Sequence, residues 1–100
     1  MDVRTCKGDD GPLYILSGAL TYSDGPAFSP ITKDCGAAGH RVITLDLSEL
    51  ERIDSIGLGL ILVAWDEAQG AQNRLVLRHA GERVRRLIEM TDLADLLIGE

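Results

Sequence analysis

The chain has 100 residues, of which 45% are apolar and 26% are charged, and its formal net charge is −6. This length suits one domain with one hydrophobic core, so we predict a single domain over residues 1–100. The acidic balance argues against nucleic acid and anionic membranes as partners, because both attract basic surfaces.

The two cysteines, Cys6 and Cys35, are far apart and form no disulfide framework, which favours a reduced, cytoplasmic protein. We expect Cys6 to be a small core residue of a strand and Cys35 to lie in a helix. The first twelve residues lack the apolar core of an export signal. The longest apolar run, 56–65, is too short to cross a bilayer, so we expect no membrane insertion.

The first third of the chain predicts a hairpin followed by a helix. Residues 2–7 alternate weakly and indicate an edge strand, turn formers follow, and a second strand runs over 13–20. Ser23 or Asp24 is then positioned to cap a helix that Gly36 would end.

The clearest strand covers residues 41–47, and its apolar density is typical of a central strand covered on both faces. We expect residues 48–53 to form a loop and 55–71 to form a helix, followed by a parallel strand at 75–77. The expected inward stripe of that helix consists of Leu58, Ile61, Leu62, Trp65 and Ala68.

Two shorter helices are expected at 81–90 and 92–97, the second capped by Asp92. Alternating strands and helices indicate an α/β fold. We therefore predict a four- or five-stranded mixed β-sheet with helices packed mainly on one face.

The most informative segment joins the central strand to the long helix. The strand ends in Asp46-Leu47-Ser48, Ile53 follows, and Asp54-Ser55-Ile56-Gly57-Leu58 opens the apolar helix. This pattern resembles the signature of the STAS family, and within it the anti-sigma factor antagonists. The resemblance extends more weakly over residues 13–98, including Ser17-Gly18-Ala19-Leu20 and Phe28.

The resemblance implies a switch that binds a protein partner. In such proteins the serine matching Ser55 is phosphorylated by a GHKL-type serine kinase that is also the anti-sigma factor, and a PP2C-type phosphatase reverses the reaction. It implies a partner-binding surface at Asp54, Ser55, Ile56, Gly57 and Leu58. A phosphate at Ser55 would also lie at a helix N-terminus, where free N–H groups and the helix dipole favour anions.

Other interpretations of the same residues remain open. Ser55 could be only a helix cap, and Gly57 could simply allow close packing. The domain could equally be a scaffold of a stressosome-like assembly or the small STAS subunit of a lipid-transport ABC system. A homodimer is compatible with free sheet edges, although no residue specifies one.

We do not expect an enzyme. A serine hydrolase needs glycine two residues before its nucleophile, and Ile53 occupies that position. His40 and His79 each lie beside a strand and are expected at the surface or in loops. The scattered histidines and cysteines have no metal-ligand spacing, so we expect no metal and no cofactor.

Overall fold

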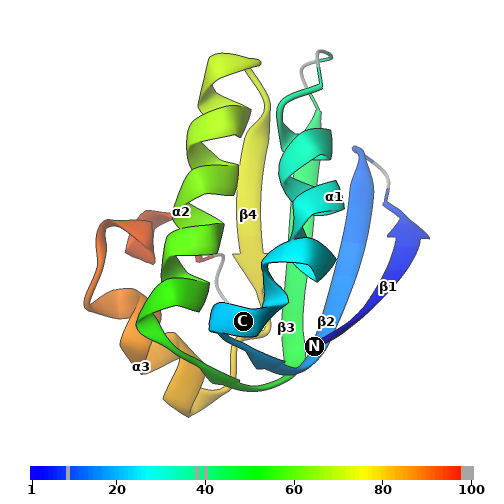
Figure 1. Ribbon diagram of the computed structural model, residues 1–100. Coiled ribbons are helices and arrows are strands. Elements are labelled where there is room, and N and C mark those ends of the chain that lie inside the picture. Colours follow the sequence, from blue (N-terminus) through cyan, green and yellow to red (C-terminus); the bar gives the residue numbers. More distant parts are fainter. Residues whose placement is uncertain (9, 38, 40, 98–100) are drawn as a thin grey trace.

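The computed structural model describes residues 1–8, 10–37, 39 and 41–97 (Figure 1). Its strands are β1 (Asp2–Lys7), β2 (Pro12–Leu20), β3 (Val42–Ile53) and β4 (Arg74–Arg78). Its α-helices are α1 (Gly25–Cys35), α2 (Ser55–Gly70) and α3 (Glu82–Glu89). Two short 3-10 helices are η1 (Tyr22–Asp24) and η2 (Asp92–Leu96).

The four strands form one mixed sheet in the order β1-β2-β3-β4. β1 and β2 pair antiparallel, as the predicted hairpin requires. β2 with β3 and β3 with β4 pair parallel, each across a helical crossover. The predicted α/β class is confirmed, and of the four or five strands expected in a mixed sheet the described residues form four.

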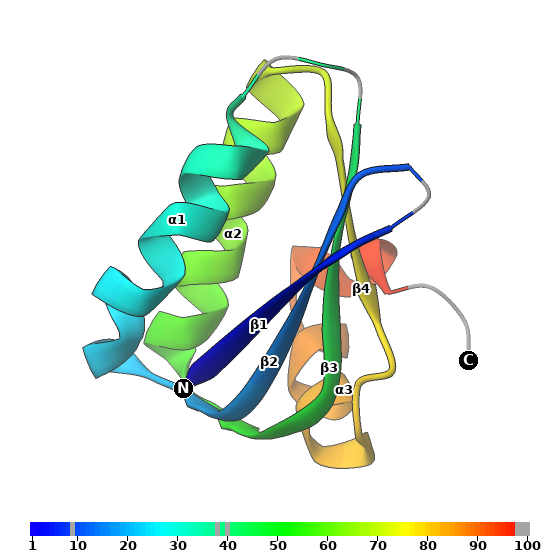
Figure 2. The ribbon, with the colours of Figure 1, turned by 90° about the vertical axis from the view of Figure 1, so that its right-hand side faces the viewer.

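Helices α1 and α2 lie side by side on one face of the sheet (Figure 2). The core fills the space between them and the strands, and α3 closes one end of it with Val84 and Ile88. Phe28, which belongs to α1, is fully buried. These contacts explain the apolar spacing of α1 and α3.

The prediction that the central strand is covered on both faces was wrong. In β3 the buried side chains Ile43, Leu45 and Leu47 alternate with the half-buried Val42 and Thr44. The buried residues belong to the core beneath the helices, whereas the alternate residues lie on the open face.

Residues 48–53 are not a loop, because they complete the twelve-residue strand β3. Relative to β2, this strand carries an extra residue at two places. The first lies between the pairs Ile15–Asp46 and Ser17–Glu49. The second lies between the pairs Gly18–Leu50 and Ala19–Arg52. Such bulges insert one residue and change the side-chain alternation. Leu47, Leu50 and Ile53 are consequently buried at every third position, with two exposed residues between each.

Three further expectations were wrong in detail. Cys6 is exposed on the edge strand, whereas Cys35 is buried in α1 as expected for a helix residue. Leu62 is 45% exposed, because the buried line of α2 passes through Gly57, Ile61, Ala64 and Ala68 instead. Thr91, and not Asp92, caps η2 by accepting a hydrogen bond from the backbone N–H of Leu93 at 3.1 Å.

A polar network joins the end of α1 to the start of β3. Tyr14 donates its hydroxyl hydrogen to Asp34 Oδ2 at 2.7 Å, and Arg41 reaches Asp34 Oδ1 at 2.9 Å. Asn73, which follows α2, is buried and donates to the carbonyl oxygens of Cys35 and Ala37. This network lies beyond the C-terminal end of α2, and Ser55 lies at the N-terminal end.

Candidate functional site

Ser55 is the first residue of α2, and its side chain is exposed. Asp54 occupies the capping position, where its Oδ1 accepts a hydrogen bond from the backbone N–H of Gly57 at 2.7 Å. In the part of the chain that the structure describes, the Ser55 hydroxyl makes no recorded hydrogen bond. The capping role therefore belongs to Asp54 and leaves the Ser55 hydroxyl available at the surface.

The same Asp54 carboxylate also holds the neighbouring segment η1. Its Oδ2 accepts a hydrogen bond from the backbone N–H of Tyr22 at 3.2 Å. The backbone N–H of Asp54 donates in turn to the carbonyl oxygen of Leu20 at 3.2 Å. These bonds bring the end of β2, η1 and the start of α2 together around Ser55.

Gly57 is buried where α2 crosses the end of β2. A Cβ atom added to Gly57 would lie 2.2 Å from the carbonyl oxygen of Leu20, so no larger residue fits without a shift. A Cβ atom added to Gly59 would meet nothing within 4 Å. The two glycines thus differ: Gly57 permits a close approach, whereas Gly59 leaves open space on the outer side of the helix.

The five residues expected to form the partner-binding surface lie at different depths. Ser55 and Ile56 are exposed, while Asp54 and Leu58 are half-buried. Gly57 is buried, so it positions the surface and does not itself form it.

Exposed apolar side chains surround Ser55, and sequence reasoning did not find most of them. On α2 itself, Ile56 is 54% exposed, and Leu62, which lines the same groove as Ser55, is 45% exposed. Tyr22 from η1 and Met90 from the end of α3 are 74% and 78% exposed. The sequence does contain an indication of this surface, because α2 has no charged residue before Asp66. A helix that is apolar on all sides needs a partner on the side that the core does not cover.

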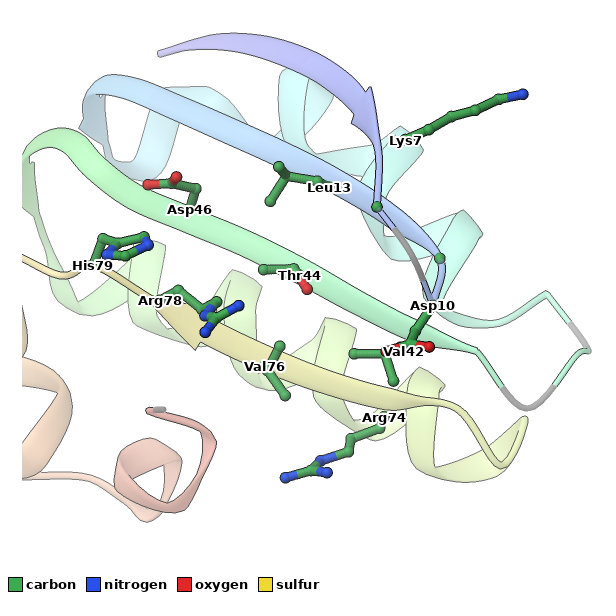
Figure 3. Close-up of a pocket in the computed structure, with 12 residues that line it drawn as sticks. Lys7, Asp10, Leu13, Val42, Thr44, Asp46, Arg74, Val76, Arg78 and His79 are labelled. Carbon is green, nitrogen blue, oxygen red and sulfur yellow. The ribbon is translucent and has the colours of Figure 1, made fainter. Parts of the chain in front are cut away.

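A hollow of about 530 Å³ lies on the open face of the sheet, away from α1 and α2. Figure 3 shows Lys7 and Arg74 directed away from its centre. His79 lies at this hollow and is exposed, whereas His40 lies outside the described residues. Among the described residues, no three His, Cys, Asp or Glu side chains cluster as a metal site would require.

The chain belongs to the STAS family, since residues 9–99 match the family model described as "Mlab, STAS domain". It is 38% identical over 56 residues to the anti-sigma-B factor antagonist of Listeria monocytogenes, a match that covers 56% of this chain and 49% of that protein. The chain thus spans about half the length of the curated relative. Within the described residues, no helix is long and apolar enough to span a bilayer.

Solved structures share the fold at low sequence identity. The unphosphorylated anti-sigma factor antagonist SpoIIAA superposes with a TM-score of 0.80 at 19% identity, covering 97% of this chain and 86% of that chain. A STAS domain protein from Planctomyces limnophilus gives a TM-score of 0.82 at 14% identity, covering 100% and 92%. SpoIIAA from Bacillus in its phosphorylated form gives 0.69 at 17% identity, covering 97% and 89%.

Proposed function

We propose that this protein is an anti-sigma factor antagonist that binds an anti-sigma factor through the surface around Ser55. The observation that carries the proposal is the exposed Ser55 hydroxyl within a surface of exposed apolar side chains. Such patches on a small protein mark interaction sites. The names of the Listeria relative and of SpoIIAA support this choice of partner.

Phosphorylation of Ser55 is the proposed control of binding. A phosphate adds about −1.5 to −2 charge at neutral pH. The N-terminus of α2 already holds the Asp54 carboxylate, whose two oxygens accept the N–H groups of Gly57 and Tyr22. The phosphate would therefore add charge beside an existing carboxylate, and burying it against an apolar partner would carry a desolvation cost.

The proposed partners are a GHKL-type serine kinase that is itself the anti-sigma factor and a PP2C-type phosphatase. The unphosphorylated protein would bind the kinase and release the sigma factor, and the phosphatase would restore this form. The protein contributes an exposed acceptor and a contact surface in this scheme, and no catalytic group.

The test is a pull-down from native lysate with wild type, Ser55→Ala and Ser55→Asp as baits, followed by mass spectrometry. We expect wild type and Ser55→Ala to retain an anti-sigma factor and Ser55→Asp to lose it. Ser48→Asp is the matched control, because Ser48 is also exposed but lies on β3, outside the apolar surface. Equal recovery by all four baits would contradict the proposal.

The alternative STAS functions predict other outcomes of the pull-down and of size-exclusion chromatography. A scaffold of a stressosome-like assembly would elute as a large oligomer on size exclusion and would recover related STAS proteins. The small subunit of a lipid-transport ABC system would recover a transporter ATPase from the membrane fraction. Either result would replace the proposed function without changing the fold.

A further inference from the structure

The hollow on the open face of the sheet has the form of a small-molecule site (Figure 3). Its volume of about 530 Å³ lies within the range of ligand pockets, which is roughly 300–1,000 Å³. Three neighbouring strands, β2, β3 and β4, form its floor through Leu13, Val42, Thr44 and Val76. The helices α1 and α2 cover the other face of the sheet, so the hollow is separate from the surface around Ser55.

One wall of the hollow is held in place by backbone contacts. The backbone N–H of Val42 donates a hydrogen bond to the carbonyl oxygen of Asp10 at 3.1 Å. A Cβ atom added to Gly11 would lie 2.2 Å from the carbonyl oxygen of Val42, so the start of β2 and the start of β3 are in direct contact. The wall therefore exists before any ligand arrives, as is usual for small-molecule sites.

The other end of the hollow offers an arginine without a partner. Arg78 ends β4 and lies opposite Asp46 in the register of β3 and β4. Figure 3 shows its guanidinium directed over the sheet toward Thr44. Among the described residues, Arg78 makes no recorded hydrogen bond or ion pair. Its N–H groups are therefore available to a carboxylate or a phosphate, which arginine binds through two parallel hydrogen bonds.

His79 stands beside this arginine in a backbone conformation that most side chains avoid. Its φ is +59°, in the left-handed region that glycine adopts most easily. Strained residues of this kind are concentrated at ligand sites and active sites. Figure 3 shows the ring at the same end of the hollow as Arg78, where a ring N–H can donate to the same anionic group.

The charges around the hollow differ from those of the whole chain. The chain has 10 basic and 16 acidic residues. The hollow, in contrast, is lined by three basic side chains and two acidic ones, which are Lys7, Arg74, Arg78, Asp10 and Asp46. An anion is therefore attracted to this part of an otherwise acidic protein.

We propose that this hollow binds a small molecule that has one carboxylate or phosphate group and an apolar body. The anionic group binds between Arg78 and His79, and the apolar body covers the floor at Val42 and Val76. This inference does not depend on the proposed function, because the site lies on the other face of the sheet from α2 and needs no partner protein.

An NMR titration of the ¹⁵N-labelled protein tests the proposal with two probes, octanoate and octyl phosphate. We expect the amide signals of Thr44, Val76 and Arg78 to shift with at least one of them, while the signal of Ser55 stays unchanged. The probe that binds more tightly identifies the preferred anionic group. Acetate and inorganic phosphate lack the apolar body, and octanol lacks the charge, so each should bind at least about tenfold more weakly.

Charge at one position is tested by Arg78→Gln, which should weaken binding of the preferred probe by at least about tenfold, the usual loss for a hydrogen bond to a charged group. Arg83→Gln is the matched control, because Arg83 is also exposed but belongs to α3 and removes the same charge. It should bind the probe like wild type.

A second pair of variants separates the His79 ring from its backbone. His79→Gly removes the ring and relieves the left-handed conformation, so the variant should be no less stable than wild type but should bind the probe more weakly. Gln72→Gly is the matched control, since Gln72 is exposed, has a φ of +62° and lies before β4, outside the hollow. It should be equally stable and should bind like wild type.

Three results would overturn the proposal. The first is that neither octanoate nor octyl phosphate shifts the signals of Thr44 and Val76. The second is that acetate or inorganic phosphate binds as tightly as the octyl probes, since the hollow would then be only a charged surface. The third is an equal loss of binding in Arg78→Gln and Arg83→Gln, which would reflect the net charge of the protein and no specific site.

Discussion

The backbone N–H of Tyr22 donates a hydrogen bond to Asp54 Oδ2 at 3.2 Å, across 32 positions of sequence. The other carboxylate oxygen of Asp54 accepts from the N–H of Gly57 at 2.7 Å. One side chain therefore caps α2 and fixes η1 beside it. The surface around Ser55 depends on this double contact, because Tyr22 and Ile56 come from the two segments that it joins.

The first prediction concerns these two bonds. Asp54→Ala removes both, and we expect the free energy of unfolding to fall by about 1–2 kcal/mol, since losing a cap alone costs about 1 kcal/mol. Asp54→Asn has one amide oxygen, so it can restore the cap or the bond to Tyr22 but not both. Urea unfolding should rank it between wild type and Asp54→Ala. An unchanged free energy in Asp54→Ala would mean that the carboxylate does not organise the site.

The second prediction contrasts two glycines of the same helix. Gly57→Ala places a Cβ 2.2 Å from the carbonyl oxygen of Leu20, and overpacking of this kind costs about 1–3 kcal/mol. Gly59→Ala meets no atom within 4 Å and should raise the free energy of unfolding by up to about 1 kcal/mol, because alanine favours helix. Chemical unfolding of both variants checks the pair. Similar effects at the two positions would contradict the close approach at Gly57.

The elements that the sequence predicted well are those with a regular apolar period. The strand that begins near residue 42 has this property, whereas the hairpin was marked by its turn formers and the helix that begins at Ser55 by its long apolar run; the structure has all three. The second half of β3 does not, because its two bulges bury Leu47, Leu50 and Ile53 at a spacing of three. A spacing of three is close to the helical period and far from the strand period of two, so a strand was not expected there.

The local part of the candidate site was also predictable, and its surroundings were not. Asp54 and Ser55 lie next to each other, and their position at a helix start follows from the strand before them. Tyr22 and Met90 are distant in sequence, and they reach this surface only through the packing of η1 and α3. Leu62 was assigned to the core because its spacing fits an inward stripe, yet the helix turns that side toward solvent. Spacing alone cannot orient a helix that is apolar on all sides.

The last prediction concerns stability at low pH. It rests on Asp34 of α1, which belongs to the polar network near the C-terminal end of α2. Burial alone would raise the pKa of this carboxyl, but the hydrogen bond from Tyr14 and the contact with Arg41 outweigh burial and hold the pKa below its usual value. The pKa of Tyr14 is raised, first by burial and then by its hydrogen bond to Asp34. The network therefore needs the ionised carboxylate.

Because the pKa of Asp34 is lower in the folded state, its contribution is complete above the unfolded value of about 4 and is lost as the pH falls through the folded value. We expect Asp34→Asn to reduce the free energy of unfolding by about 2 kcal/mol at pH 7, the typical contribution of a hydrogen bond to a charged group. Urea unfolding from pH 7 to pH 2 should show this difference shrinking only below about pH 4. Asp2→Asn is the control, since Asp2 is exposed on the edge strand and should change the free energy by less than about 0.5 kcal/mol. A difference between wild type and Asp34→Asn that is constant down to pH 2 would show that the charge of Asp34 does not stabilise the fold.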